Sequence, residues 1–189
     1  MNSTPRLLIA NRGEIACRII RTAQKLGWTC VAVYSQVDQN APHVQLADQA
    51  VLLGEADVNE SYLNLDRLMD VARQTKATAI HPGYGFFSEN AHFAQRCKEE
   101  GLIFVGPSPH AIELMGDKRR ARLAVTEHAV PCVPGYDGEA QDENTLIEKG
   151  SQIGFPLMVK ASMGGGGKGM RLVHEKSDLS DALECIRKI

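Results

Sequence analysis

Two lysines beside a run of glycines are the residues of this chain best suited to chemistry. Lys160 stands near the end of an apolar segment, and Lys168 directly follows the run. The glycines between them are Gly164, Gly165, Gly166 and Gly167. Because glycine has no Cβ, the backbone N–H groups of such a loop can approach an anion closely. Lysine adds a positive point charge that suits a phosphate. The pattern therefore predicts a loop that holds the phosphates of a nucleotide.

The segments on either side of the glycines restrict the kind of nucleotide loop. Residues 156–161 and 170–173 both read as strands. Gly164, Gly166 and Gly169 have the spacing of a dinucleotide fingerprint, but that motif must open a helix. A Walker A loop needs Ser or Thr after its lysine, and glycine stands there. A strand–loop–strand unit is instead typical of a flap over ATP, as in kinases and ATP-grasp ligases. The simpler alternative is a hairpin turn, which needs only one or two glycines.

Composition limits the classes of partner. The chain has 189 residues, which is enough for one domain and part of another. It is 43% hydrophobic and 23% charged, an ordinary composition for a globular protein. A net charge of −2 gives no support to nucleic-acid or anionic-membrane binding. The apolar runs are too short to span a bilayer. We expect neither nucleic acid nor membrane as a partner.

The cysteines indicate a reducing compartment. There are five, an odd number, and none forms a C-x-x-C pair. This argues against a disulfide framework or a zinc site, and we expect all five to be small buried side chains. The expected location is the cytoplasm, or the mitochondrial matrix for a eukaryotic parent.

The first hundred residues alternate short apolar strands with helices. The expected strands are 7–10, 30–34, 50–53, 78–80 and 102–105. Apolar residues at helical spacing predict helices within 15–26, 65–72 and 91–97, the last capped by Ser88. Such alternation implies an α/β fold with a doubly wound parallel sheet. Ligands bind beyond the carboxyl ends of such strands, where loops 11–14 and 81–90 should lie.

The remainder predicts a linker and a smaller lobe. Ser108 followed by proline is a strong helix start, and residues 108–129 read as one or two helices broken near Gly116. A helix at 142–152, the two strands around the glycines and a last helix capped by Ser177 follow. We therefore expect an N-terminal domain at 1–115, a helical linker at 116–130 and an incomplete α+β lobe at 131–189. The helical pattern runs to the last residue, which predicts a truncated chain whose final helix leaves its apolar stripe partly exposed.

Seven segments together are similar to a known family. They are 9–16, 81–90, 104–107, 115–118, 130–135, 159–162 and 164–171. In this order they resemble the N-terminal part of biotin carboxylase, the ATP-grasp component of biotin-dependent carboxylases. The Ala-Cys-Arg at 16–18 and the Gly-Tyr-Asp-Gly at 135–138 look most like the biotin-containing subunits of methylcrotonyl- or geranyl-CoA carboxylases.

The resemblance implies a specific reaction. Biotin carboxylase uses MgATP to activate bicarbonate as carboxyphosphate, and then carboxylates biotin tethered to a carrier domain. Lys118 and Lys160 would contact ATP phosphates, and the glycines 164–167 with Lys168 would form a closing flap. Closure would keep water from the labile carboxyphosphate. The implied partners are bicarbonate, a biotin carboxyl carrier domain and a carboxyltransferase subunit.

Loop 81–90 is the second candidate site. In the family it lies where bicarbonate and biotin meet, which implies roles near them for His81, Gly83, Tyr84 and Glu89. For His81, a structural hydrogen bond and a functional role stay equally open. For Glu89, the simpler interpretation is a negative charge at a helix N-terminus. The turn at 11–14 could offer a helix N-terminus to an anion, but a shape-setting turn is the preferred interpretation.

Other parts of the family's machinery have no match here. The adenine hinge, the acidic magnesium ligands and the groups that bind bicarbonate match no residue of this chain, and no biotin-attachment motif is present. We therefore assign no catalytic residue and no metal ligand, and expect the isolated chain to be inactive. A homodimer is possible through Arg18 and Arg21, although Lys25 replaces the glutamate of that contact.

Two alternatives stay open. One is another ATP-grasp ligase, such as a carbamoyl-phosphate synthetase or a purine-pathway ligase, in which the loop at 81–86 would not be expected. The other is a non-catalytic module that binds nucleotide or docks on a partner. The final acyl acceptor is not encoded in this stretch.

Overall fold

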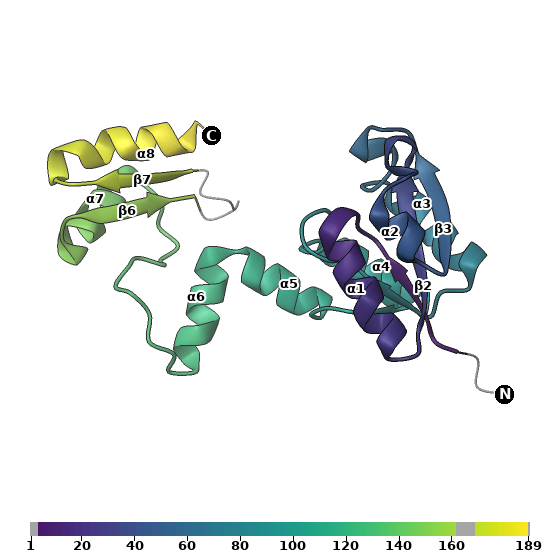
Figure 1. Cartoon of the computed structure of the whole chain (residues 1–189). Helices are drawn as coiled ribbons and strands as arrows, with labels where there is room; N and C mark the ends of the chain where they lie inside the picture. The colour runs from purple at the N-terminus through teal and green to yellow at the C-terminus, as the bar shows by residue number, and fades with distance from the viewer. Residues whose placement is uncertain (1–3, 162–168, 189) are drawn as a thin grey trace. The chain divides into compact units, whose positions relative to one another are not determined.

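A computed structural model describes residues 4–161 and 169–188 (Figure 1). The glycine run and Lys168 lie outside the described residues. The chain divides into two compact units, residues 1–113 and residues 114–189, and each unit is described by itself.

The first unit is built on a five-stranded parallel sheet with the strand order β3-β2-β1-β4-β5. The strands are β1 (Arg6–Ile9), β2 (Thr29–Ser35), β3 (Gln49–Gly54), β4 (Ala79–His81) and β5 (Ile103–Phe104). Every pair of neighbours is parallel. A strand covered on both faces needs a continuous apolar run, and the central strands have one: Leu8, Ile9 and Val31 are fully buried. The predicted doubly wound sheet is confirmed.

Helices cover both faces of this sheet. On one face α1 (Gly13–Lys25) and α2 (Pro42–Leu46) pack over the β1 and β2 side chains that point that way. On the other face α3 (Leu65–Thr75) and α4 (Ala91–Glu99) form the second core with the alternate residues of the same strands. Helix α2 has only five residues and begins with proline, so its apolar spacing gives no periodic signal in the sequence.

Two details of the first unit differ from the sequence predictions. Helix α4 is capped by Asn90, whose Oδ1 accepts a hydrogen bond from the Phe93 N–H at 2.8 Å, so the predicted Ser88 cap is wrong. The amide of Asn90 stands three residues before that N–H, which is the spacing an N-cap requires. Three cysteines of this unit are buried, but Cys132 and Cys185 of the second unit are exposed, so burial of all five is also wrong.

Three helices lie between the sheet and the next strand of the chain. Helix α5 (Pro109–Gly116) starts as predicted, with the Ser108 hydroxyl accepting from the Ala111 N–H at 3.2 Å. Helix α6 (Lys118–Glu127) begins after Asp117, whose carboxylate accepts from two N–H groups of its first turn. Helix α7 (Glu143–Ile153) is capped by Asp142, whose Oδ1 accepts from the Thr145 N–H at 2.9 Å.

The second unit contains a two-stranded antiparallel ribbon covered on one face by helices. Its strands are β6 (Leu157–Lys160) and β7 (Met170–Val173), and α7 and α8 (Leu179–Arg187) pack on them. The predicted Ser177 cap is wrong, because Ser177 lies in a 3₁₀ turn and α8 begins at Leu179. Leu179 and Leu183 are buried against the ribbon and α7, so the predicted exposure of the apolar stripe is wrong for both.

Within residues 4–161 and 169–188, no helix combines the length and apolar character needed to cross a membrane.

Candidate functional site

The first candidate site lies where the strand order of the sheet reverses. The chain runs outward from β1 through β2 to β3, and then returns to β4 on the other side of β1. The loops that follow β1 and β4 therefore meet at the carboxyl edge, the usual ligand position in such sheets. An open hollow of about 330 Å³ lies there. Its lining residues are Asn11, Arg12, Gly13, Glu14, Ile15, Tyr84, Gly85 and Phe86.

Asn11 ties the two loops together. Its Nδ2 donates to the carbonyl oxygens of Pro82 at 2.7 Å and Tyr84 at 2.8 Å. Its Oδ1 accepts from the Arg12 N–H at 2.8 Å. Both amide hydrogens of this buried side chain are thus used inside the protein. Asn11 is a structural link, which favours the shape-setting interpretation of the turn at 11–14.

His81 and Gly83 support the same loop. Gly83 has φ +67°, and a Cβ there would lie 2.7 Å from the Asn11 Nδ2, so only glycine fits without a shift. The Gly83 N–H donates to the His81 Nδ1 at 3.0 Å. This acceptor role places the proton of the neutral imidazole on Nε2. Burial, followed by the nearby Arg18, lowers the pKa of His81, so the ring is neutral at pH 7.

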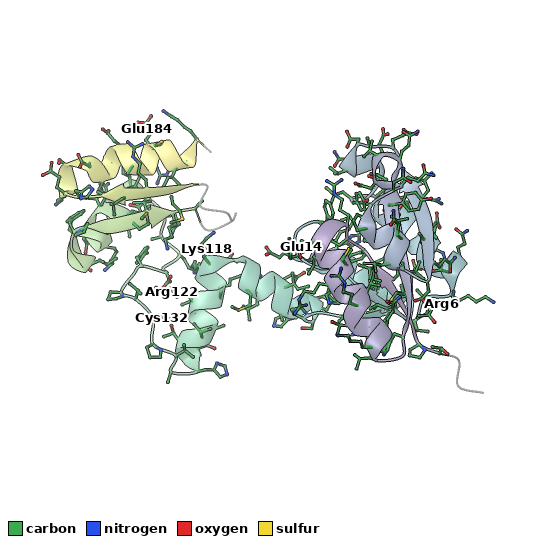
Figure 2. The ribbon with its side chains drawn as sticks, viewed as in Figure 1. Arg6, Glu14, Lys118, Arg122, Cys132 and Glu184 are labelled. Carbon is green, nitrogen blue, oxygen red and sulfur yellow. The ribbon has the colours of Figure 1, made fainter. Side chains whose placement is uncertain are left out.

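Tyr84 and Glu14, which both line the hollow, are joined by a hydrogen bond. The Tyr84 side chain is exposed, and its hydroxyl donates a hydrogen bond to the Glu14 carboxylate. That hydrogen bond, with a smaller effect of burial and of the negative charge, raises the pKa of Tyr84. Glu14 lies in the first turn of α1 (labelled in Figure 2), where the helix dipole favours a carboxylate. Glu14 was not predicted as a site residue; the only signal in the sequence was its place in the loop at 11–14.

Arg12 is neutralised by partners on other elements. Its Nη1 lies 3.0 Å from the Asp38 Oδ2, and its guanidinium carbon lies 5.0 Å from the Tyr62 ring centre and 5.7 Å from that of Phe86. The Asp38 carboxylate also accepts from the Tyr62 hydroxyl at 2.7 Å and from the Ser35 hydroxyl at 2.9 Å. Burial alone would raise the pKa of Asp38, but these hydrogen bonds outweigh it and lower the pKa. Arg12 therefore serves an internal ion pair.

Glu89 stands apart from the hollow. It is exposed and directly precedes Asn90, the N-cap of α4. It does not belong to the residues that line the hollow. Its position at the positive end of a helix matches the simpler interpretation, a charge favoured by the helix dipole.

The second candidate site is the open face of the β6–β7 ribbon. Met158 pairs with Leu172, and Lys160 pairs with Met170. Because strand side chains alternate, these four lie on the face opposite the helices, and the three apolar ones are 42–50% exposed. Exposed methionine and leucine side chains grouped on one face make this ribbon a candidate binding surface. The three apolar residues were not predicted as site residues, although the alternation in both strands pointed to them.

The remaining predicted residues are only partly placed. Lys118 is the first residue of α6 and is exposed (labelled in Figure 2). The glycines 164–167 and Lys168 lie outside the described residues, so the structure does not bring them together with Lys160. Among the described residues no group of three His, Cys, Asp or Glu side chains could hold a metal ion. No magnesium ligand is therefore assigned to them.

Two family models match the chain. Residues 3–112 match the biotin carboxylase N-terminal domain. Residues 117–188 match the ATP-binding domain of the carbamoyl-phosphate synthase L chain. The first match alone covers more than half of the chain.

Curated proteins and solved structures with related sequences are similar along nearly the whole chain. The α subunit of mitochondrial methylcrotonoyl-CoA carboxylase from Dictyostelium discoideum is 49% identical over 97% of this chain, which spans 26% of that protein. Biotin carboxylase 2 of Bacillus subtilis is 51% identical over 97% of this chain and 41% of its own length. The chain thus spans about a quarter to two fifths of these relatives.

Two crystal structures extend the similarity to the fold. A biotin carboxylase–β,γ-ATP complex from Campylobacter jejuni has a TM-score of 0.93 at 39% identity, covering 98% of this chain and 42% of that one. The biotin carboxylase domain dimer of the Hydrogenobacter thermophilus 2-oxoglutarate carboxylase, in complex with MgADP, ADP and bicarbonate, has a TM-score of 0.89 at 43% identity. That match covers 100% of this chain and 41% of the other.

Proposed function

Because this chain belongs to the biotin carboxylase family, we propose that it supplies part of the ATP site and the bicarbonate- and biotin-facing loop of an ATP-dependent biotin carboxylase. The observation that carries the proposal is the open ribbon face. An exposed apolar surface lies on the same face as Lys160, at the end of the strand that leads to the glycines. A nucleotide has the matching chemistry, an apolar flat base joined to an anionic phosphate tail.

We assign the ATP contacts to the second unit. Met158, Met170 and Leu172 offer dispersion contacts to the base, and Lys160 offers a point charge to the phosphates. Lys118 is proposed to contact the phosphates as well, and the glycines with Lys168 are proposed to form the closing flap. MgATP, when bound, supplies the phosphoryl group that activates bicarbonate. The lysines would stabilise the negative charge that develops during its transfer.

We assign the acceptor side of the reaction to the switch-point loop. Tyr84 lines the hollow, and His81 and Gly83 hold the backbone that carries it. Glu89, in the same loop but outside the lining of the hollow, is proposed to lie near the bound biotin or bicarbonate. A neutral His81 adds no positive charge near bicarbonate, so its proposed role is support of the loop. The hollow is open, which fits a ligand delivered on a flexible tether.

The division of labour follows the family. We propose a biotin carboxylase N-terminal domain at 1–115, a helical linker at 116–130 and a part of the ATP-grasp lobe at 131–189. The proposed partners are a biotin carboxyl carrier domain, a carboxyltransferase subunit and a second copy of the protein, contacted through Arg18 and Arg21 of α1. We propose that the protein is located in the cytoplasm, or in the mitochondrial matrix for a eukaryotic parent.

The test uses the full-length product of the gene that encodes this chain. Cleavage of MgATP is measured with bicarbonate and free biotin, with either one omitted, and with labelled bicarbonate to detect carboxybiotin. We expect cleavage and label transfer that need both substrates. Bicarbonate-dependent cleavage with no carboxybiotin would instead indicate another ATP-grasp ligase. Tight binding of an ATP analogue without any cleavage would indicate a nucleotide-binding module, and either result would overturn the proposal.

A further inference from the structure

Side chains of the turn between β1 and α1 hold the loop that follows β4, chiefly by hydrogen bonds to the backbone of that loop. Asn11 donates hydrogen bonds to the carbonyl oxygens of Pro82 and Tyr84. The Arg12 guanidinium, fixed by its ion pair with Asp38, lies against the Phe86 ring. Asn11 therefore fixes the backbone on both sides of the Tyr84 Cα, and Arg12 adds a contact with the Phe86 side chain.

The loop needs such support because it contains a phenylalanine with an unfavourable backbone angle, whereas its two glycines adopt a positive φ at no steric cost. Gly83 and Gly85 each have φ +67°, and Phe86 has φ +40°. A phenylalanine in the left-handed region is held there only by its surroundings. Phe86 is stacked parallel to Tyr62, with ring centres 5.1 Å apart, in addition to its contact with Arg12.

The Tyr84 side chain lacks comparable support from packing. Its exposed fraction is 61%, so few neighbours restrict the rotation of its ring. The Glu14 carboxylate is the partner that receives its hydroxyl hydrogen, across 70 positions of sequence. A hydrogen bond to a carboxylate is among the stronger kinds in proteins, and Glu14 is held in place by the first turn of α1.

We propose that Glu14 is a positioning residue, which orients the Tyr84 hydroxyl at the hollow so that its oxygen meets a ligand as a hydrogen-bond acceptor. The proposal rests on the proposed function, in which Tyr84 lies beside the bicarbonate and biotin site. Since the single hydroxyl hydrogen is committed to Glu14, the oxygen has only lone pairs left to offer. It would therefore select an N–H group, such as that of a cyclic urea, and disfavour an anion's oxygen.

The first test is spectroscopic and uses this chain without any substrate. Tyrosine Cζ chemical shifts are followed against pH in the ¹³C-labelled protein, and Tyr84→Phe identifies the Tyr84 signal. Glu14→Gln keeps the size and the helix position of residue 14 but removes its charge. We expect the raised pKa of Tyr84 to fall toward its ordinary value in Glu14→Gln. Glu60→Gln, an exposed glutamate of the same unit, is the control and should leave the titration unchanged.

The second test is kinetic and uses the full-length enzyme. Glu14→Gln is expected to raise the KM for biotin about tenfold, the scale of one charge-assisted hydrogen bond, while the KM for MgATP is unchanged. If Glu14 acts through Tyr84, the double variant with Tyr84→Phe should be no worse than the more severe single variant.

An unmoved Tyr84 titration, or additive effects in the double variant, would overturn the positioning role. The two proposals fail separately. A wild-type enzyme that forms no carboxybiotin would refute the proposed function, whereas the Tyr84 titration decides the Glu14 pairing by itself.

Discussion

The two candidate sites of this protein are built in different ways. At the switch point of the first unit, the contacts that join the two loops connect residues far apart in sequence, as in the hydrogen bond between Tyr84 and Glu14. On the ribbon of the second unit, the candidate residues are ladder partners within one hairpin, as Lys160 is to Met170. The first site depends on the whole sheet, whereas the second depends on two strands.

This difference has a physical consequence. The switch-point loop is held by a buried amide, an internal ion pair and stacked rings, so it is formed before any ligand arrives. Helices cover only one face of the ribbon, and the apolar side chains on its other face are exposed. We therefore expect substitutions at the switch point to affect folding, and substitutions on the ribbon face to affect binding.

The largest effect is expected from Lys160. In the full-length enzyme Lys160→Met keeps the length of the side chain but removes the charge from the ribbon face. The expected loss in kcat/KM for MgATP is about 100- to 1000-fold, the usual cost of one group that stabilises transition-state charge. The control is Lys149→Met. Lys149 lies on α7, the helix that packs on the covered face of the ribbon, so this variant should leave kcat/KM for MgATP unchanged. Equal losses in both variants would contradict the assignment of the ribbon face to ATP.

The next prediction concerns two glycines with the same backbone angle. Gly85→Ala meets no atom within 4 Å and should cost only the strain of its left-handed φ, about 1–2 kcal/mol. Gly83→Ala must also displace the Asn11 amide and its hydrogen bonds, for a total of about 2–4 kcal/mol. Urea unfolding followed by the fluorescence of Trp28, which packs against the core of the first unit, measures both. Equal losses would show that Asn11 does not hold the loop.

Hydrogen exchange compares the two units directly. Strands β1 and β2 are central in a sheet covered on both faces, whereas β6 and β7 have one open face. Opening of the ribbon exposes less apolar surface, so its amides should exchange at least about tenfold faster. Mass spectrometry of exchanged peptides from both units provides the measurement. Equal protection of the two units would contradict the expected difference in their local stability.

The smallest effect is a pH dependence of the first unit. His43 is fully buried, and its Nε2 lies 3.2 Å from the Val33 carbonyl oxygen. Burial lowers its pKa below the ordinary 6.5, against a raising effect of that hydrogen bond and of Asp38, while Arg12 adds to the lowering. As the pH falls below 6.5, His43 binds a proton in the unfolded chain but stays neutral in the folded chain. The free energy of unfolding should therefore decrease.

Variants separate His43 from the other groups that titrate. His43→Phe should flatten this dependence without abolishing it, because burial lowers the pKa of His81 in the same direction. Asp38 has a lowered pKa and contributes only at more acidic pH. An identical slope in His43→Phe and the wild type would contradict the role of His43.

Much of the fold could be predicted from local patterns, and the errors have local causes. The order of strands and helices follows from apolar runs and helical spacing, and the Ser108 helix start was correct. The caps at Ser88 and Ser177 were wrong by one or two positions, because several polar residues near each helix start could serve and only the backbone path selects one. Helix α2 was too short to leave a periodic signal.

The sequence by itself determined the parallel sheet, the two helical layers and the position of Lys160 on a strand, since these depend on which residues must be buried within short segments. Only the tertiary structure decided that Glu14 meets Tyr84 and that Arg12 is paired with Asp38. Those contacts exist because β4 lies beside β1 in the sheet and the end of β2 lies on its other side. Strand order is a property of the whole packed sheet, and no local stretch of residues specifies it.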